Sequence, residues 1–247
     1  MADDGRYWTD SISPVTGCTP AGAGCDHCWA RAMVGRFGHL HAVAGDDGEC
    51  VPQPFDEPRF SARPLAGLQR WKKPRRVALS WLGDLFHHDV QNHQIARVLT
   101  AMSQAPQNRY LVLTKRAGRM VEYLNDSCSE PSSNEWWGAS AWDNASASEA
   151  LEHSGELDQG RNFWLSLEPL LGPVTLIGGM IPDWVVVGQE TGPGARPCRP
   201  EWVEQIVDDC RTLRVPVWVK SAPVRADGRF WPREMPKGLW LPGEVRK

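Results

Sequence analysis

Residues 110–116 read Tyr-Leu-Val-Leu-Thr-Lys-Arg, a short apolar run that ends in polar and charged side chains. A continuous apolar run of this length is typical of a strand that is covered on both faces. Similar runs recur at 8–13, 77–81, 135–140, 162–167, 184–188 and 215–220. Helical periodicity is found at 29–37, 92–105, 117–125, 145–154 and 201–213. Strands that alternate with helices predict βαβ units and a parallel sheet.

The number of runs predicts a barrel-like sheet. Seven strands are many for a small open sheet, so we expect a partial or near-complete TIM-type β/α barrel. With 247 residues, of which 41% are hydrophobic, the chain is long enough for one substantial core. We therefore predict a single α/β domain over 1–247. Two parts fall outside the alternation: a Gly-, Pro- and His-rich insertion at 38–64 and an extended, proline-containing tail at 221–247.

Upstream of this pattern lies a loop with three closely spaced cysteines. Cys18, Cys25 and Cys28 have the spacing C-x6-C-x2-C and are separated mainly by glycine, alanine and proline. Such a loop can fold back so that its thiolates converge, and three thiolates leave one coordination position of a metal centre open. A 4Fe–4S cluster is one interpretation, in which the other cysteines (Cys50, Cys128, Cys198 and Cys210) are not ligands.

Zinc is the alternative metal at this loop. Cys25 and Cys28 form one zinc knuckle, and a nearby side chain could complete a tetrahedron. The candidates for that ligand are His27, His39, His41 and Cys50. The sequence contains no second C-x2-C pair, although structural zinc sites usually combine two such knuckles.

Polar side chains follow most of the predicted strands. In parallel α/β folds the functional site lies at the carboxyl ends of the strands, so these side chains should meet at one rim with the cysteine loop. A rim of alternating carboxylates and ammonium groups suits a polar, zwitterionic ligand. The expected rim residues are Asp84, Lys115, Glu168, Glu190 and Lys220.

The charge balance restricts the partners. A formal net charge of −3 argues against non-specific, charge-driven binding of nucleic acid, but a local basic groove is compatible with it. The run Arg70–Arg76 is basic and is interpreted either as a solvated edge before a strand or as a contact for an anionic partner. No apolar run approaches the length of a membrane span, and the first residues lack a signal-peptide core. We therefore expect no membrane partner and a cytoplasmic location.

The chain resembles a family. The segments 8–18, 24–28, 70–76, 84–87, 113–116, 165–173, 188–197 and 219–220 look like the three-cysteine proteins common in bacteriophages and prophages. That family is regarded as radical-SAM-like and has no assigned biochemical function. Here the first cysteine gap is six residues, whereas radical SAM enzymes usually have C-x3-C-x2-C.

The resemblance implies a fold, cofactors and partners. Radical SAM enzymes have a partial or full parallel β/α barrel, and three cysteines bind a 4Fe–4S cluster whose fourth iron chelates S-adenosylmethionine (SAM). Cys18, Cys25 and Cys28 would then be the metal ligands. Catalytic roles fall to Asp84, Lys115 and Glu168, and cofactor binding to Lys115, Glu168, Gln189, Glu190, Gly192 and Lys220.

Two functions remain open. The first is a radical SAM enzyme of a host bacterium's cytoplasm, served by an electron-donor reductase, with a nucleotide or nucleic acid as the first substrate candidate. The second is a non-enzymatic phage protein in which zinc or a structural cluster holds the loop, and whose partner is a host or phage protein or DNA.

Overall fold

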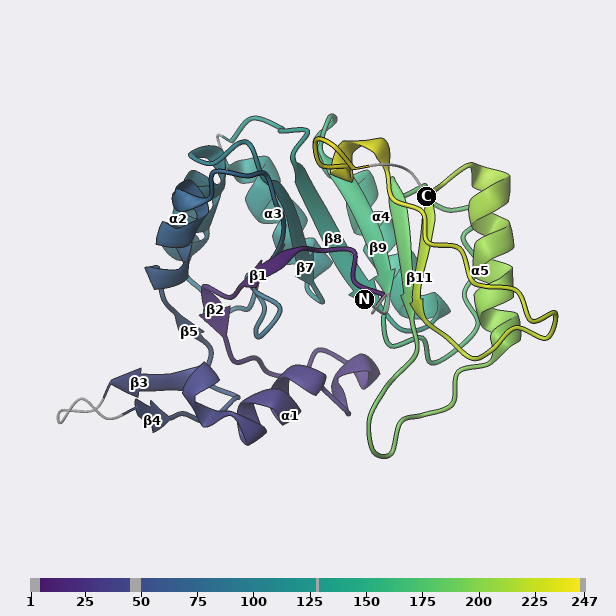
Figure 1. Ribbon diagram of the computed structural model, residues 1–247, viewed down its shortest axis with the longest axis horizontal. Helices are drawn as coiled ribbons and strands as arrows, with labels where there is room; N and C mark the ends of the chain where they lie inside the picture. Colours follow the sequence, from purple (N-terminus) through teal and green to yellow (C-terminus); the bar gives the residue numbers. More distant parts are fainter. Residues whose placement is uncertain (1–4, 45–49, 128, 245–247) are drawn as a thin grey trace.

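The computed structural model describes residues 5–44, 50–127 and 129–244 (Figure 1). Cys128 lies outside the described residues. Cys50 opens strand β4, and its side chain is likewise not described.

A curled sheet of seven parallel strands forms a half-barrel, with neighbours in chain order throughout (Figure 1). This confirms the predicted fold class, and the sheet remains open between its first and last strands. The order is β1 (Asp10–Ile12), β6 (Arg76–Leu79), β7 (Arg109–Thr114), β8 (Glu135–Ala141), β9 (Asn162–Leu167), β10 (Trp184–Gly188) and β11 (Val217–Ser221).

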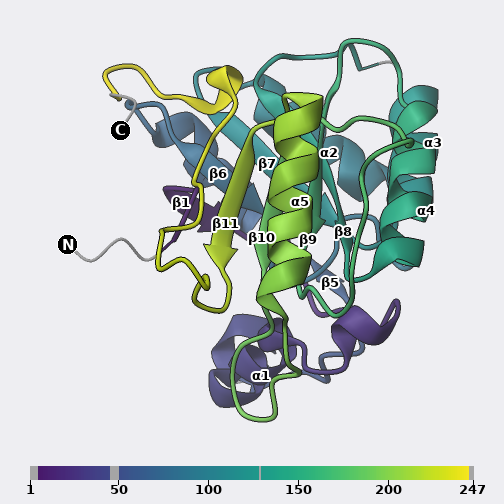
Figure 2. The same cartoon turned by 90° about the vertical axis from the view of Figure 1, so that its right-hand side faces the viewer.

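Helices cover the convex face of the sheet (Figures 1 and 2). Four of them are amphipathic enough to bury one side, with Ile95, Leu124, Leu151 and Ile206 in the shared core. Residues 168–183, between β9 and β10, contain no helix but bury Leu170, Val174 and Leu176 against the same core. The four helices are α2 (Asn92–Ser103), α3 (Ala117–Asp126), α4 (Asn144–Gly155) and α5 (Pro200–Leu213).

The cysteine loop and α1 (Trp29–Arg36) lie at the carboxyl end of the sheet, toward which the strand arrows point in both views. Residues 38–64, expected to be irregular, carry short elements. Antiparallel pairing joins β3 to β4 and β2 to β5. The short elements are β2 (Val15–Thr16), η1 (Ala23–Cys25), η2 (Gly38–His41), β3 (Ala42–Ala44), β4 (Cys50–Pro52), β5 (Arg59–Phe60), η3 (Arg63–Arg70) and η4 (Lys237–Leu239).

Tryptophans fill the concave side of the half-barrel at its amino end. Trp136, Trp164, Trp184 and Trp218 form one buried cluster with Tyr7. Trp164 crosses β8 at Gly138, where an added Cβ would lie 2.3 Å from the indole. The indole nitrogen of Trp164 donates to the carbonyl of Trp136 over 3.2 Å. We call these four tryptophans the indole plug, and it restricts any cavity to the carboxyl end of the barrel.

Residues 5–8 run across the open edge between β1 and β11. The indole nitrogen of Trp218 donates to the Gly5 carbonyl over 3.0 Å, and the Arg76 Nε donates to the Tyr7 carbonyl over 2.9 Å. This segment therefore contacts β6, next to the first edge strand, and β11, the last edge strand. The tail follows the β11 edge, where Glu234 donates its amide to the Val217 carbonyl over 2.9 Å, and Leu239 then covers the amino end of the plug.

Two arginines of the basic run are engaged within the protein. Arg75 forms a two-bond pair with Asp10 at 2.7 and 2.8 Å, and buried Arg76 pairs with Glu244. Arg70, Lys72 and Lys73 extend from this run as exposed cations. The run also precedes β6, at the end of the sheet opposite the cysteine loop. None of the helices in the described ranges combines the length and apolar character needed to cross a membrane.

The plug generates a stability prediction. Gly138→Ala forces a methyl group into the Trp164 indole and should lower the free energy of unfolding by about 1–3 kcal/mol. Gly67→Ala is the matched control, because a Cβ there meets no atom within 4 Å. Urea unfolding measures both variants. Equal stability of Gly138→Ala and wild type would show that Trp164 does not lie over β8.

Candidate functional site

A cavity of about 530 Å³ opens at the carboxyl ends of the strands. The cysteine loop forms one wall, and the strand ends form the other. Gly192 is not among the lining residues; it lies in the exposed loop after β10 with a φ of +102°. The remaining predicted site residues all line the cavity, namely Cys18, Cys25, Cys28, Asp84, Lys115, Glu168, Gln189, Glu190 and Lys220.

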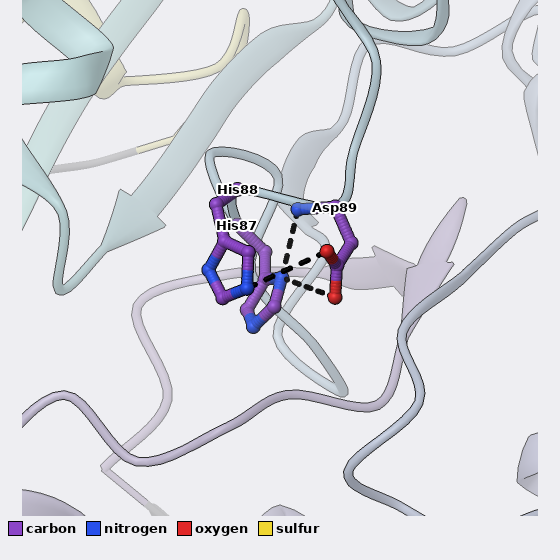
Figure 3. A group of neighbouring side chains, drawn as sticks. All are labelled: His87, His88 and Asp89. Carbon is purple, nitrogen blue, oxygen red and sulfur yellow. Dashed lines mark hydrogen bonds and ion pairs between the residues drawn. The ribbon is translucent and has the colours of Figure 1, made fainter.

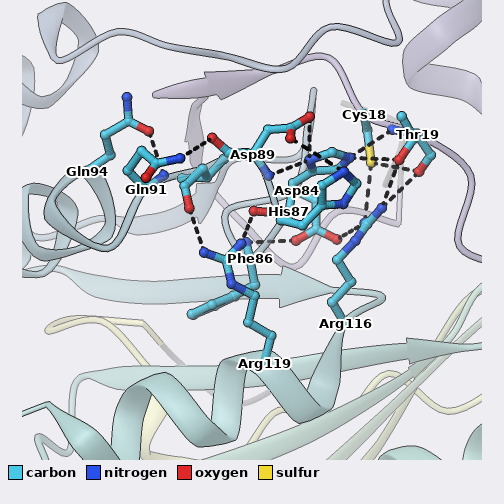
Figure 4. Close-up of polar contacts among 12 residues, drawn as sticks. Cys18, Thr19, Asp84, Phe86, His87, Asp89, Gln91, Gln94, Arg116 and Arg119 are labelled. Atoms are coloured by element: carbon cyan, nitrogen blue, oxygen red, sulfur yellow. Dashed lines mark hydrogen bonds and ion pairs between the residues drawn. The ribbon is translucent and has the colours of Figure 1, made fainter.

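Arg116 and Asp84 attach the beginning of the cysteine loop to the sheet (Figure 4). The guanidinium of Arg116 lies 2.8 Å from Asp84, 3.5 Å from the Cys18 sulfur and 3.0 Å from the Thr19 carbonyl. Asp84 also accepts bonds from the Thr114 hydroxyl and from the amides of Phe86 and Lys115. Both carboxylate oxygens are therefore occupied, and Asp84 is a buried junction between the β6 and β7 ends and the loop.

His87 supports the same part of the loop. Its Nδ1 accepts the Asp89 amide at 3.2 Å, and its Nε2 lies 2.7 Å from the Thr19 hydroxyl and 3.4 Å from the Thr19 amide. Burial lowers the pKa of His87 to about 4, so the ring is neutral at neutral pH. The rings of His87 and His88 lie 4.1 Å apart beside Asp89 (Figure 3). Because both His87 nitrogens are engaged, this group is a support for Thr19.

Arg196 holds the other end of the cysteine loop. It donates to the Ala23 carbonyl over 2.9 Å and to Asp26 over 3.0 Å, and its backbone amide and Nε bond to Glu190. His27 adds a further bond to Glu190 at 2.9 Å. The hydrogen bond from the Arg196 side chain lowers the pKa of Glu190 to about 2, despite burial of that carboxylate. The loop is thus joined to the β10 end through a fully ionised pair.

Trp142, which follows β8, supports the middle of the loop. An added Cβ would lie 2.4 Å from its ring at Gly22 and 2.7 Å at Gly24. These two glycines therefore let the cysteine backbone approach the indole closely, which explains their place in the motif.

Glu168 and Lys220 form the ion pair of the opposite wall, at 2.9 Å. Lys220 is the extra residue of a β-bulge, because Val187 pairs with Val219 while Gly188 pairs with Ser221. Glu168 packs against Gly188, where an added Cβ would lie 2.3 Å from a carboxylate oxygen. The bulge and the glycine together let both charged groups occupy the strand end.

Lys115 differs from its neighbours in having a free ammonium group. Among the described residues, its Nζ has no carboxylate within ion-pair distance, while its backbone amide bonds Asp84. Its Cε lies near Gly24, 3.4 Å from where a Cβ would be. Lys115 is therefore, as far as the described residues go, an uncompensated cation of the cavity, and it lies directly beside the cysteine loop.

The three thiols are spaced too widely for a single ion. Within the part of the chain that the structure describes, only His87, His88 and Asp89 have three ligand atoms all within 4.8 Å of one another. Tetrahedral zinc with Zn–S bonds of about 2.3 Å would hold its sulfurs about 3.8 Å apart. In a 4Fe–4S cluster each thiolate binds a different iron atom, so the thiolates need not reach a single ion.

The histidines proposed as zinc ligands are engaged or distant. His41 donates from Nε2 to the Pro54 carbonyl at 3.0 Å and accepts the Thr16 hydroxyl at Nδ1, at 2.8 Å. His27 bonds Glu190, and His39 does not line the cavity. Burial and the nearby Asp84 carboxylate raise the pKa of Cys18 to about 11, so its thiol is neutral without a metal.

Several contributors to the site were not predicted as site residues. Tyr7, Trp8 and Trp81 line the cavity, but they lie before β1 or directly after β6, with no charge to mark them. Arg116 and Arg196 follow predicted strand ends, and this position is the feature of the sequence that could have identified them as site residues. Their partners, however, depend on side-chain geometry. Cys198 and Cys210 lie away from the cavity; Cys210 is buried in the core on α5.

The Glu190–Arg196 pair predicts a pH dependence. Glu190→Gln should lower the free energy of unfolding at pH 7 by roughly 1–3 kcal/mol. A depressed pKa stabilises the fold above the unfolded value of about 4.3, and this contribution is lost as the pH falls toward 2. The difference from wild type should therefore shrink between pH 5 and pH 2.5 in urea titrations. Exposed Glu149→Gln on α4 is the control, and a difference that stays constant with pH would contradict the assignment.

Comparison with known proteins places this architecture in one family. A search of curated proteins and a search of solved structures each return no match. A family model described as "Protein of unknown function (DUF5131)" matches residues 6–231. The matched range includes the cysteine loop, every strand of the half-barrel and both arginine supports. Because one model spans most of the chain, the protein belongs to the DUF5131 family.

Proposed function

We propose that this protein is an iron–sulfur enzyme of radical SAM type, in which Cys18, Cys25 and Cys28 hold a 4Fe–4S cluster and SAM binds beside it. The proposal follows from the resemblance of the sequence to the three-cysteine proteins of phages. One observation carries it: the three cysteines and the charged strand-end residues face each other across a single cavity.

The cavity suits a zwitterionic ligand next to a metal centre. Its volume of about 530 Å³ is within the usual range for small-molecule and cofactor sites, roughly 300–1,000 Å³. The thiols line one side with the Lys115 ammonium beside their loop, and the Glu168–Lys220 pair lines the other. A ligand with an ammonium, a carboxylate and a sulfonium group finds complementary charges there.

Different residues of the chain would bind different groups of SAM. Lys115, whose ammonium has no carboxylate partner among the described residues, is the group that would bind the SAM carboxylate. Glu168 can accept from the SAM ammonium or ribose hydroxyls while it keeps Lys220. Gln189 lines the same wall. The Gly192 loop borders the cysteine loop at Gly194, near His27, where its backbone could lie against adenine.

The roles in the chemistry follow from the contacts. When bound and reduced by an electron-donor reductase, the cluster supplies the electron for reductive cleavage of SAM. Lys115 and Glu168 remain the candidate catalytic residues because both reach the cavity. Asp84, first considered catalytic, is reassigned as a positioning residue, since its oxygens hold Arg116, Thr114 and two amides. A nucleotide or nucleic acid is the substrate class that we propose.

Single alanine changes test the cluster ligands. Cys18→Ala, Cys25→Ala or Cys28→Ala should each remove most of the brown absorbance and most of the bound iron and sulfide after anaerobic reconstitution. Cys198→Ala is the control and should retain both. Stoichiometric zinc without sulfide in wild type, or equal bleaching by Cys198→Ala, would replace this proposal with a structural metal site.

Charge-neutral substitutions test the SAM site. Lys115→Gln and Glu168→Gln should each weaken SAM binding about tenfold, because each removes one charge-assisted hydrogen bond, while the iron content is unchanged. Lys73→Gln, at the amino end of the sheet, is the matched control. Titration with SAM, followed by reduction with dithionite, should give 5′-deoxyadenosine. If wild type with an intact cluster neither binds SAM nor forms this product, the radical SAM function is wrong.

A further inference from the structure

We infer that the outer side of α1 is a docking track for a single-stranded nucleic acid and that it leads into the cavity. This surface, the α1 face, consists of Trp29, Met33 and Phe37 with Arg36 beside them. That the docked strand is the substrate of the enzyme rests on the proposed function, whereas the binding of the strand does not.

The apolar residues of α1 are distributed in an unusual way. Trp29, Met33 and Phe37 are 51%, 38% and 43% exposed, and their spacing of four residues places them along one side of the helix. The buried side carries the smaller residues Ala30 and Val34. A helix that only packs against its own core buries its large apolar residues and exposes polar ones. In α1 this arrangement is reversed, so the large side chains are available to a partner.

Trp29 belongs both to the α1 face and to the wall of the cavity. It directly follows Cys28, the N-cap residue of α1, and it lines the cavity although half of its surface is open to solvent. From there the α1 face continues along the helix, away from the cysteine loop, with a rise of about 6 Å for every four residues. A partner that lies on α1 can therefore extend into the cavity past Trp29, provided that it is thin and flexible.

The charges around the α1 face favour an anion. The helix contains two arginines and no carboxylate. The carboxylates next to it are engaged, because Asp56 pairs with Arg31 and Asp26 pairs with Arg196. Arg36 is exposed and forms no ion pair within the part of the chain that the structure describes. The α1 face thus has an excess of positive charge, although the whole protein has a formal net charge of −3.

Exposed aromatic rings next to a free cation are typical of surfaces that hold single strands. Bases stack on such rings largely irrespective of their identity, while the cations follow the phosphates. The Arg36 guanidinium lies 5.2 Å from the Phe37 ring centre, so a nucleotide docked at that ring has its phosphate within reach of the cation. A folded acidic protein would match the same charge but would not reach past Trp29. A single strand matches both the charge and the shape.

Fluorescence anisotropy of the full-length protein tests the track, with a fluorescein-labelled oligothymidylate of twelve nucleotides as the probe. We expect saturable binding that weakens as salt is added. Trp29→Ala and Phe37→Ala should each weaken the binding about tenfold, because each removes one stacking surface. Arg36→Gln should reduce the slope of log Kd against log salt concentration by about 0.7, the contribution of one phosphate contact in a single strand.

Two variants outside the α1 face are the matched controls. Phe230→Ala removes an aromatic ring that is 99% exposed in the tail, and Lys73→Gln removes an exposed cation at the amino end of the sheet. Both should bind the probe as wild type does. A blunt duplex and an abasic strand of the same length should bind more weakly, because neither offers unstacked bases. Urea unfolding verifies that each variant is folded.

Absence of saturable binding, wild-type affinity in Trp29→Ala and Phe37→Ala, or equal affinity for the abasic strand overturns the inference. If the strand is not bound but Arg36→Gln slows reduction of the reconstituted cluster by an acidic flavodoxin, the α1 face is the surface for an electron carrier instead. The titrations use protein isolated in air without SAM. Saturable binding of the strand therefore stands even if the cluster and 5′-deoxyadenosine measurements refute the radical SAM function.

Discussion

The buried ion pair between Arg116 and Asp84 is the interaction on which the cavity depends. It joins the turn after β6, the end of β7 and the first cysteine in a single hydrogen-bonded unit. Such a pair is weak evidence for stability, because removing two charges from water is costly. Its value is geometric: the planar guanidinium fixes Cys18 and Thr19 relative to the sheet. Arg196 performs the equivalent task at Ala23 and Asp26.

The indole plug sets the depth of the site. In a closed β/α barrel, layers of branched aliphatic side chains usually fill the interior. Here four large rings fill only the amino half, and Gly138 provides the room that Trp164 needs. The carboxyl half is left as a cavity whose lower boundary is aromatic and whose upper boundary carries the cysteines. The high tryptophan content thus divides between the core and the wall of the site.

Much of the fold could be predicted from the sequence because its strands are buried on both faces. The run at 110–114 has no polar residue before its end, and its strand is observed at Arg109–Thr114. The rim was predictable for a similar reason, since parallel strands bring their carboxyl ends together. What the sequence could not provide is how the charges pair. Asp84 and Lys115 are equivalent as strand-end residues, yet Asp84 is fully bonded whereas the Lys115 ammonium has no carboxylate partner in the described part of the chain.

Tyr7 was beyond prediction for a different reason. It precedes the first strand, and its place in the cavity depends on contacts between residues more than 200 positions apart, such as Trp218 with Gly5. The basic run Arg70–Arg76 is the opposite case, in which the sequence suggests more than the structure contains. Its sequence suggests a binding surface, but Arg75 and Arg76 are engaged by Asp10 and Glu244, which local sequence does not reveal.

The segment 5–8 has a consequence for the order of biosynthesis. It leaves the ribosome long before the β11 edge that it contacts, because Gly5 and Trp218 are 213 positions apart. Domains generally fold as units during synthesis, so this contact cannot form until β11 has been synthesised. The aromatic lining around Tyr7 is therefore completed late, and whatever occupies the cavity enters only after all seven strands exist.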